Sequence, residues 1–210
     1  MQPDVIDWLL DGDVAIQYQA YRDLLDEERL DLQRRIAAEG WGARFMAARN
    51  DDGSWGRGFY QPKWISSHYT LLDLKTLAIA PDHALIRASV DKIAGEQKGP
   101  DGGVNPSVTI KESDVCVNGM FLNYACYFGQ PEKTLHSIVD FVLSQQMADG
   151  GFNCRKNRSG ARHSSLHSTL SVLEGIQEYA ANGYRYRLAE LQQAAEDGRE
   201  FMLQHQLFKS

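Results

Sequence analysis

The chain has little of what marks membrane, secreted or nucleic-acid-binding proteins. None of its 210 residues belongs to a stretch approaching the ~18 apolar residues of a membrane span. Its first residues are acidic around a short apolar run, unlike a secretory signal. Its three cysteines are an odd number and widely spaced, so they give no disulfide framework. The net charge of −6 supplies no basic face for nucleic acid. We therefore predict a reduced, cytoplasmic protein with no membrane span and no nucleic-acid partner.

Alternating runs of β-branched residues are absent as well, whereas apolar residues recur at helical spacing along the whole chain. This pattern predicts an all-α protein. Three segments, 68–80, 114–128 and 167–181, are apolar on most sides, which is typical of buried helices. Segments 82–98 and 132–147 carry more charge and are predicted to be outer, solvated helices.

A short phrase recurs at roughly fifty-residue intervals, which is typical of repeat proteins. It consists of Asp52-Gly53, Asp101-Gly102 and Asp149-Gly150, each at the end of a predicted helix and before a long loop. Glycine there suits the left-handed conformation that ends helices. We predict one domain over 1–210. Its parts are a helical preamble at 1–38, helix pairs at 39–80, 81–128 and 129–182, and the start of a truncated fourth repeat at 183–210.

The final segment, 199–207, is similar to 140–147 and therefore predicts the outer helix of a fourth unit. Stacked repeats need capping, because an uncapped end exposes apolar surface. We expect this open edge to be covered by a second copy in a homo-oligomer, by a partner, or by a C-terminal segment missing from this chain.

The turn sequences Asp51-Asp52-Gly53-Ser54-Trp55 and Gln146-Met147-Ala148-Asp149-Gly150-Gly151-Phe152 resemble those of squalene cyclases and protein prenyltransferase β subunits. The resemblance covers roughly residues 40–207 and implies an incomplete α/α toroid of helix-pair repeats. Considered as a whole, the sequence is most similar in character to bacterial squalene-cyclase-related proteins of undetermined activity. The matching segments are 8–13, 116–120 and 163–167.

A finer resemblance is to the prenyltransferase β subunits, which carry in successive repeats a His, an Asp-x-Cys and a second His. It implies that His68 meets a diphosphate and that Asp114, Cys116 and His167 hold zinc. Thiolate, imidazole and carboxylate are ordinary zinc ligands. Asp114 and Cys116 are about 200° apart on an ideal helix, so both can bind one ion only if Asp114 lies in the cap turn. The plainer interpretation is that Asp114 caps the helix and Cys116 is a small core residue.

The loop before His167 is basic in an acidic protein and resembles a Gly-Gly, Lys-rich loop of the same family. With the positive ends of the inner helices, its charges could hold a diphosphate; a solvated loop is the alternative. We also predict an apolar pocket, or ordinary core, at two aromatic residues, and an alternative polar site beside the loop. The diphosphate candidates are Arg155, Lys156, Arg158 and Arg162, the aromatic candidates are Trp64 and Tyr69, and the alternative polar site is Cys154 with His163.

The acidic Asp-x-Asp-Asp motif of protonating cyclases and the Asp-Asp-x-x-Asp motif of ionising synthases are both absent. Cyclisation driven by a carboxylic acid therefore lacks its acid. The leading hypothesis is a prenyltransferase- or terpenoid-related transferase acting on an isoprenoid diphosphate, with zinc as the implied cofactor. One alternative is a non-catalytic toroid that binds an apolar small molecule or a partner protein. Another is an enzyme of unrelated chemistry that uses Cys154, His163 and His167 as nucleophilic or acid–base groups.

Overall fold

A computed structural model describes residues 3–107 and 110–209, with the backbone alone at positions 3, 4, 157 and 158. Within these ranges the regular elements are helices and no strand is present, which confirms the all-α prediction. None of the described helices is both long and apolar enough to cross a membrane. The chain divides into two compact units, an N-terminal unit, Met1–Ser89, and a C-terminal unit, Val90–Ser210. The predicted single domain stays a prediction, and each unit is described by itself.

The N-terminal unit contains short helices fastened to one another by side-chain hydrogen bonds. Asp13 precedes the second helix, where its Oδ1 accepts from Ala15 N at 2.9 Å and its Oδ2 accepts from Trp41 N at 2.8 Å. Gln33 Nε2 donates to Ala78 O at 3.1 Å. The predicted preamble is thereby packed as part of this unit. Its helices are α1 (Pro3–Leu10), α2 (Val14–Leu24), α3 (Leu30–Arg35), α4 (Gly40–Ala47), α5 (Ser67–Thr76) and the first turns of α6 (Ala84–Glu96).

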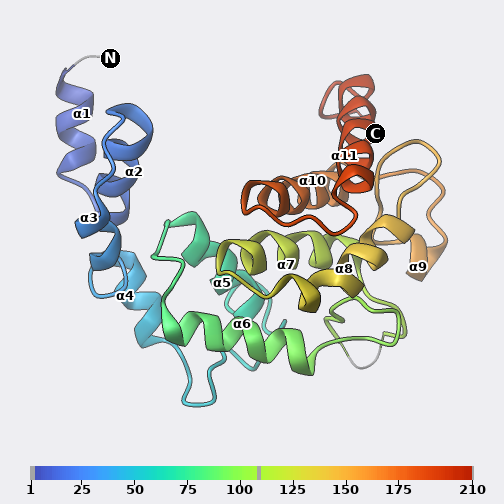
Figure 1. The fold of residues 1–210 in the computed structure, drawn as a ribbon, viewed down its shortest axis with the longest axis horizontal. Coiled ribbons are helices and arrows are strands. Elements are labelled where there is room, and N and C mark those ends of the chain that lie inside the picture. Colours follow the sequence, from blue (N-terminus) through green and yellow to red (C-terminus); the bar gives the residue numbers. More distant parts are fainter. Residues whose placement is uncertain (1–2, 108–109, 210) are drawn as a thin grey trace. The chain divides into compact units, whose positions relative to one another are not determined.

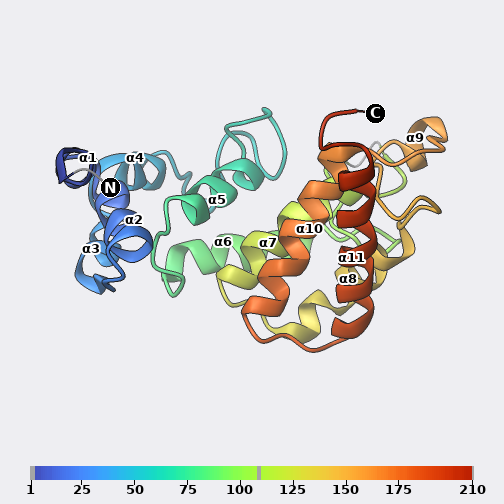
Figure 2. The ribbon, with the colours of Figure 1, turned by 90° about the horizontal axis from the view of Figure 1, so that it is seen from above.

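In the C-terminal unit, α7 (Val115–Tyr127) and α10 (Leu166–Ala181) lie side by side (Figures 1 and 2). Gly119 permits the close approach, since a Cβ there would lie 2.5 Å from Ser171 O. α8 (Glu132–Ser144) packs on α7 and α11 (Leu188–Gln204), and α11 packs on α10. The short α9 (Lys156–Ser159) lies in the loop before α10. In this unit α7 and α10 therefore form one layer and α8 and α11 another.

Burial confirms the prediction that segment 114–128 is a buried helix, because most of α7 is inaccessible to solvent. Its side chains at Phe121, Leu122 and Tyr124 are fully buried. The segment 167–181 is helical as predicted but keeps an exposed side, where Leu170 is 46% exposed. The bounds of α5, α6, α7, α8 and α10 agree within a few residues with the predicted segments 68–80, 82–98, 114–128, 132–147 and 167–181. The helix predicted at 199–207 is α11, which begins much earlier, at Leu188. The arrangement of repeats into a toroid stays a prediction.

The three Asp-Gly turns share one backbone structure. Each glycine has a positive φ, +86° at Gly53, +88° at Gly102 and +90° at Gly150, which a residue with a Cβ rarely adopts. Each glycine N–H donates to the carbonyl three residues earlier, and the N–H of that earlier residue donates to the carbonyl of the residue after the glycine. The two kinds of bond measure 2.7–3.1 Å and join Asn50, Gly53 and Ser54; Gly99, Gly102 and Gly103; and Met147, Gly150 and Gly151.

The second residue after each turn glycine is hydrogen-bonded to the second helix of the same pair. Its N–H donates to a side-chain oxygen near the start of that helix, so the turn and the helix start are fixed together. The bonds are Trp55 N to Ser67 Oγ at 2.9 Å, Val104 N to Asn118 Oδ1 at 2.7 Å and Phe152 N to Thr169 Oγ1 at 3.0 Å. The long loops therefore emerge at the N-termini of α5, α7 and α10.

Candidate functional site

A cavity of about 470 Å³ opens between the third long loop and the first turn of α10. We call it the α10 pocket. It contains three residues that the sequence predicted for a site, Cys154, Arg155 and His167, although they were assigned to three different roles. The residues that line it are Asn153, Cys154, Arg155, Ser164, Ser165, Leu166, His167 and Phe208.

Hydrogen bonds within the loop build the wall of the α10 pocket. Asp149 accepts from Ser164 through both the backbone N–H, at 2.8 Å, and the hydroxyl. Burial acts to raise the pKa of Asp149, but the hydrogen bonds from Ser164, together with those from the backbone of Gly151 and of Asp149 itself, lower that pKa on balance. Asn153 Nδ2 donates to His163 O at 2.8 Å, and Asn153 Oδ1 accepts from Arg155 N at 2.9 Å. The two arms of the loop are therefore tied to each other on either side of α9.

Two thiols meet at the pocket. Cys116, in the first turn of α7, forms a hydrogen bond with Cys154, and that bond together with burial raises the pKa of the Cys116 thiol far above its ordinary value. The backbone N–H of Cys154 donates to Ser168 Oγ at 3.2 Å, which ties this cysteine to α10. Sequence reasoning placed Cys116 and Cys154 in separate sites, because nothing in their spacing indicates that a loop after α8 returns to the start of α7.

The charge and apolar surface of the α10 pocket come from a few residues. Arg155 is exposed at its edge, and the first residues of α10 present the positive end of a helix. Leu166 and Phe208 supply apolar surface. Sequence reasoning missed Phe208, Ser164 and Ser165, since only the folded chain brings these residues to the mouth of the loop.

The other predicted basic residues do not join Arg155 in lining the pocket. Lys156 Nζ donates to Ser144 O at 3.4 Å, beside the end of α8. Arg162 is exposed on the loop, and the side chain of Arg158 lies outside the described residues. His163 is also exposed and does not line the pocket, so of the alternative polar pair only Cys154 does.

The predicted zinc ligands Asp114, Cys116 and His167 are not assembled around a common point. Among the residues with described side chains, no three His, Cys, Asp or Glu groups gather as metal ligands. Asp114 occupies the N-cap position of α7, as the plainer interpretation predicts, but its side chain makes no capping hydrogen bond, and its carbonyl accepts the ordinary helical bond from Asn118 N at 3.1 Å. The donor set does not fit zinc in this arrangement, and zinc binding stays a prediction.

His68 lies in the N-terminal unit, in the first turn of α5, inside an aromatic cluster that also contains Phe59, Tyr60, Trp64 and Tyr69. Its ring centroid is 5.3 Å from that of Phe59 and 5.2 Å from that of Tyr69. Complete burial lowers the pKa of His68 to about 3, so the imidazole is neutral at pH 7. A buried, neutral ring gives no support to the predicted diphosphate contact. Trp64 and Tyr69 do lie together, with centroids 4.8 Å apart, and Trp64 is 69% exposed.

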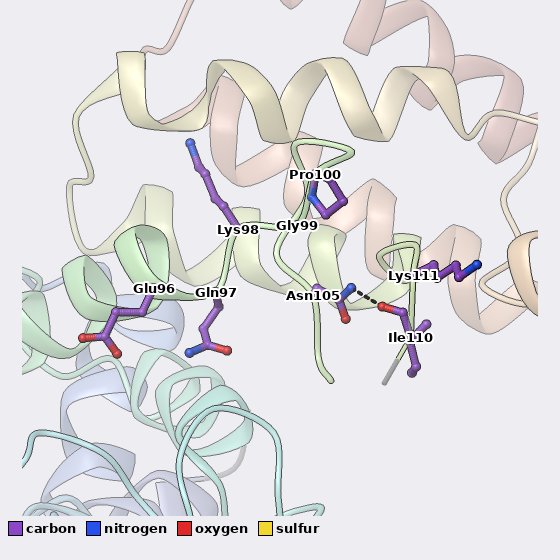
Figure 3. A pocket seen from close by; sticks show the side chains of 8 residues that line it. All are labelled: Glu96, Gln97, Lys98, Gly99, Pro100, Asn105, Ile110 and Lys111. Atoms are coloured by element: carbon purple, nitrogen blue, oxygen red, sulfur yellow. Dashed lines mark hydrogen bonds between the residues drawn. The ribbon is translucent and has the colours of Figure 1, made fainter. Parts of the chain in front are cut away.

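A second cavity, of about 500 Å³, lies beside the second long loop (Figure 3). Lys98 Nζ donates to Thr134 O at 2.9 Å, and Asn105 Nδ2 donates to Ile110 O at 2.7 Å across the loop. None of the predicted site residues lines it. The described lining residues are Glu96, Gln97, Lys98, Gly99, Pro100, Asn105, Ile110 and Lys111, which include no thiol or imidazole.

Comparisons with models of protein families, with curated proteins and with solved structures find no match for this chain. The resemblance to the toroid families therefore stays a prediction. The α10 pocket is the candidate site, because it alone among the described cavities combines a guanidinium, a thiol, an imidazole and apolar surface.

Proposed function

We propose that the C-terminal unit binds an isoprenoid diphosphate, or a ligand with the same plan of an anionic head on an apolar chain, in the α10 pocket. The observation that carries this proposal is the meeting of Arg155 and the α10 N-terminus with Phe208 in one cavity. A guanidinium and a helix N-terminus both favour phosphate oxygens. Apolar lining favours the hydrocarbon part of such a ligand.

The reaction class that fits this binding mode is prenyl or terpenoid transfer. Breaking the bond between carbon and diphosphate oxygen leaves negative charge on the diphosphate, and fixed positive groups stabilise that charge. Arg155 and the first turn of α10 would supply this stabilisation. Cys154 and His167 line the same cavity and are the groups available there for nucleophilic or acid–base work.

Calorimetric titration with farnesyl diphosphate tests the binding step. Arg155→Gln removes the charge at the pocket, and loss of one hydrogen bond to a charged group costs about 1.5–3 kcal/mol, or roughly tenfold or more in Kd. Arg185→Gln is the matched control, since Arg185 is exposed beyond the opposite end of α10. No binding at ~1 mM ligand, or equal affinities for wild type and Arg155→Gln, would contradict the proposal.

Zinc is the cofactor that the sequence resemblance implies, and no step is assigned to it because its implied ligands are not gathered. Metal analysis of protein purified without added zinc addresses it directly. Near-stoichiometric zinc that Cys116→Ala loses would support the ligand set of Asp114, Cys116 and His167. Equally low zinc in wild type and Cys116→Ala would reject it.

One observation favours the alternative of non-catalytic binding to a partner. Near the end of α11, Leu203, Leu207 and Phe208 are 64%, 62% and 73% exposed, where the sequence predicts an uncovered edge. Large apolar side chains that are exposed within a few residues of one another are candidates for an interaction surface. Light scattering of wild type and Leu207→Asp tests the second-copy form of this proposal: a dimer that the variant loses supports it, and a monomeric wild type rejects it.

A further inference from the structure

The thiols of Cys116 and Cys154 are in hydrogen-bond contact although they belong to different elements, the first turn of α7 and the loop before α9. Neither cysteine forms a disulfide in the structure. We propose that this pair is a site of oxidative modification, which a hydroperoxide converts into an intramolecular disulfide and a small-molecule thiol reverses. Formation of the disulfide requires no ligand in the α10 pocket, so this proposal does not depend on the proposed function.

The backbones that carry the two thiols are held in place by packing and hydrogen bonds. α7 and α10 approach so closely at Gly119 and Gly175 that neither position has room for a Cβ. Cys154 is fastened to α10 through its bond to Ser168 Oγ, and the neighbouring Phe152 is buried and bound to Thr169. The backbones around both thiols are therefore fixed by contacts within the C-terminal unit.

Exposure distinguishes this pair from the third cysteine. Cys116 and Cys154 are both partly accessible, and Cys154 lines the α10 pocket, through which a small oxidant reaches it. Cys126, near the end of α7, is only 1% exposed. Oxidation of thiols follows access to solvent as well as thiolate character. Cys126 is thus an internal reference that is expected to stay reduced.

The chemistry balances with hydrogen peroxide as the oxidant. The thiolate of Cys154 attacks one peroxide oxygen, the O–O bond breaks, and a sulfenic acid and hydroxide form. The sulfur of Cys116 then attacks the sulfenic sulfur, the S–S bond forms, and the S–O bond breaks. The departing hydroxide takes up the Cys116 proton and leaves as water. In sum, two thiols and one peroxide give one disulfide and two waters, and excess dithiothreitol restores both thiols by thiol–disulfide exchange.

The test treats the full chain with hydrogen peroxide, alkylates the remaining thiols and maps the peptides without reduction. Trypsin places Cys116 and Cys126 on one peptide, 112–133, and Cys154 on another, 134–155. Chymotrypsin then separates Cys116 from Cys126 by cleaving after Phe121 or Tyr124. We expect a peptide containing Cys116 to be linked to one containing Cys154 with the loss of two hydrogen atoms, and Cys126 to be alkylated. Dithiothreitol should abolish the link.

Variants make the assignment specific. Cys116→Ser and Cys154→Ser should each abolish the internal link, whereas Cys126→Ala should keep it. Separate sulfinic or sulfonic acids at Cys116 and Cys154, a link through Cys126, or a link between two chains would each overturn the proposal. The peptide map of wild type decides the question even where a variant fails to fold.

Discussion

The burial of His68 has a direct consequence for stability that also bears on its predicted role. The folded-state pKa of about 3 lies far below the ordinary histidine value of 6.5. Between these two pH values the unfolded chain binds a proton that the folded chain does not. Stability of the N-terminal unit is therefore fully present above pH 6.5 and is lost as the pH falls towards 3.

The size of this loss follows from the two pKa values. Each pH unit between them costs up to about 1.4 kcal/mol of unfolding free energy. Over the interval from pH 7 to pH 5, the contribution of His68 is about 2 kcal/mol, because little is lost above 6.5 and the full slope applies below it. His68→Gln replaces the imidazole with a neutral side chain that cannot be protonated in this range, so the variant should lack this share of the pH dependence.

Urea unfolding followed by tryptophan fluorescence measures the effect where it arises, because all four tryptophans, Trp8, Trp41, Trp55 and Trp64, belong to the N-terminal unit. The stability difference between pH 7 and pH 5 should shrink by about 2 kcal/mol in His68→Gln. His83→Gln, at the other histidine of this unit, is the control and should keep the wild-type difference. Equal pH dependence in wild type and His68→Gln would refute the reasoning.

A measurement on the unaltered protein covers the case in which His68→Gln does not fold. In a histidine NMR titration, the His68 ring signals should not move between pH 8 and pH 5. A transition near pH 6.5 would show a solvated, protonatable ring, which is the state that a diphosphate ligand would require.

Two further changes test the packing that shapes the α10 pocket. Gly119→Ala should lower the free energy of unfolding of the C-terminal unit by about 1–3 kcal/mol, because its Cβ would lie 2.5 Å from Ser171 O. The control, Gly95→Ala, has no atom near its Cβ and should be neutral or stabilising. Equal unfolding temperatures of wild type and Gly119→Ala, measured by circular dichroism, would show that α7 and α10 are not so close. Asp149→Asn should destabilise the same unit more at pH 7 than in acid below the ordinary carboxyl pKa of 3.8. The lowered pKa of Asp149 gives stability that is present above its unfolded value and is lost as the pH falls through its folded value. A loss of stability that is the same at neutral and acidic pH would show that the charge of Asp149 is not involved.

Local features of the chain were predictable because their causes are local. Helical periodicity identified α5, α6, α7, α8 and α10 to within a few residues, since an amphipathic or apolar pattern acts over neighbouring turns. It missed the single turn of α9 and the first part of α11, which begins at Leu188 and not near residue 199. The Asp-Gly phrase predicted three turns of one kind, because only glycine readily adopts the positive φ found at Gly53, Gly102 and Gly150.

The composition of the site was decided by tertiary structure. The sequence determined that Cys154, Arg155 and His167 occur near a loop and a helix start, but it did not determine which of the four basic residues would reach the cavity. It placed His68 at a helix start, where only the packing of Phe59 and Tyr69 around the ring makes it buried and neutral. The contact between Cys116 and Cys154 depends on the approach of α7 to α10 at Gly119 and Gly175, together with the return of the third loop. The helices and turns were thus determined by the sequence alone, whereas the partners of each side chain depend on residues distant in the chain, which only the packed structure brings together.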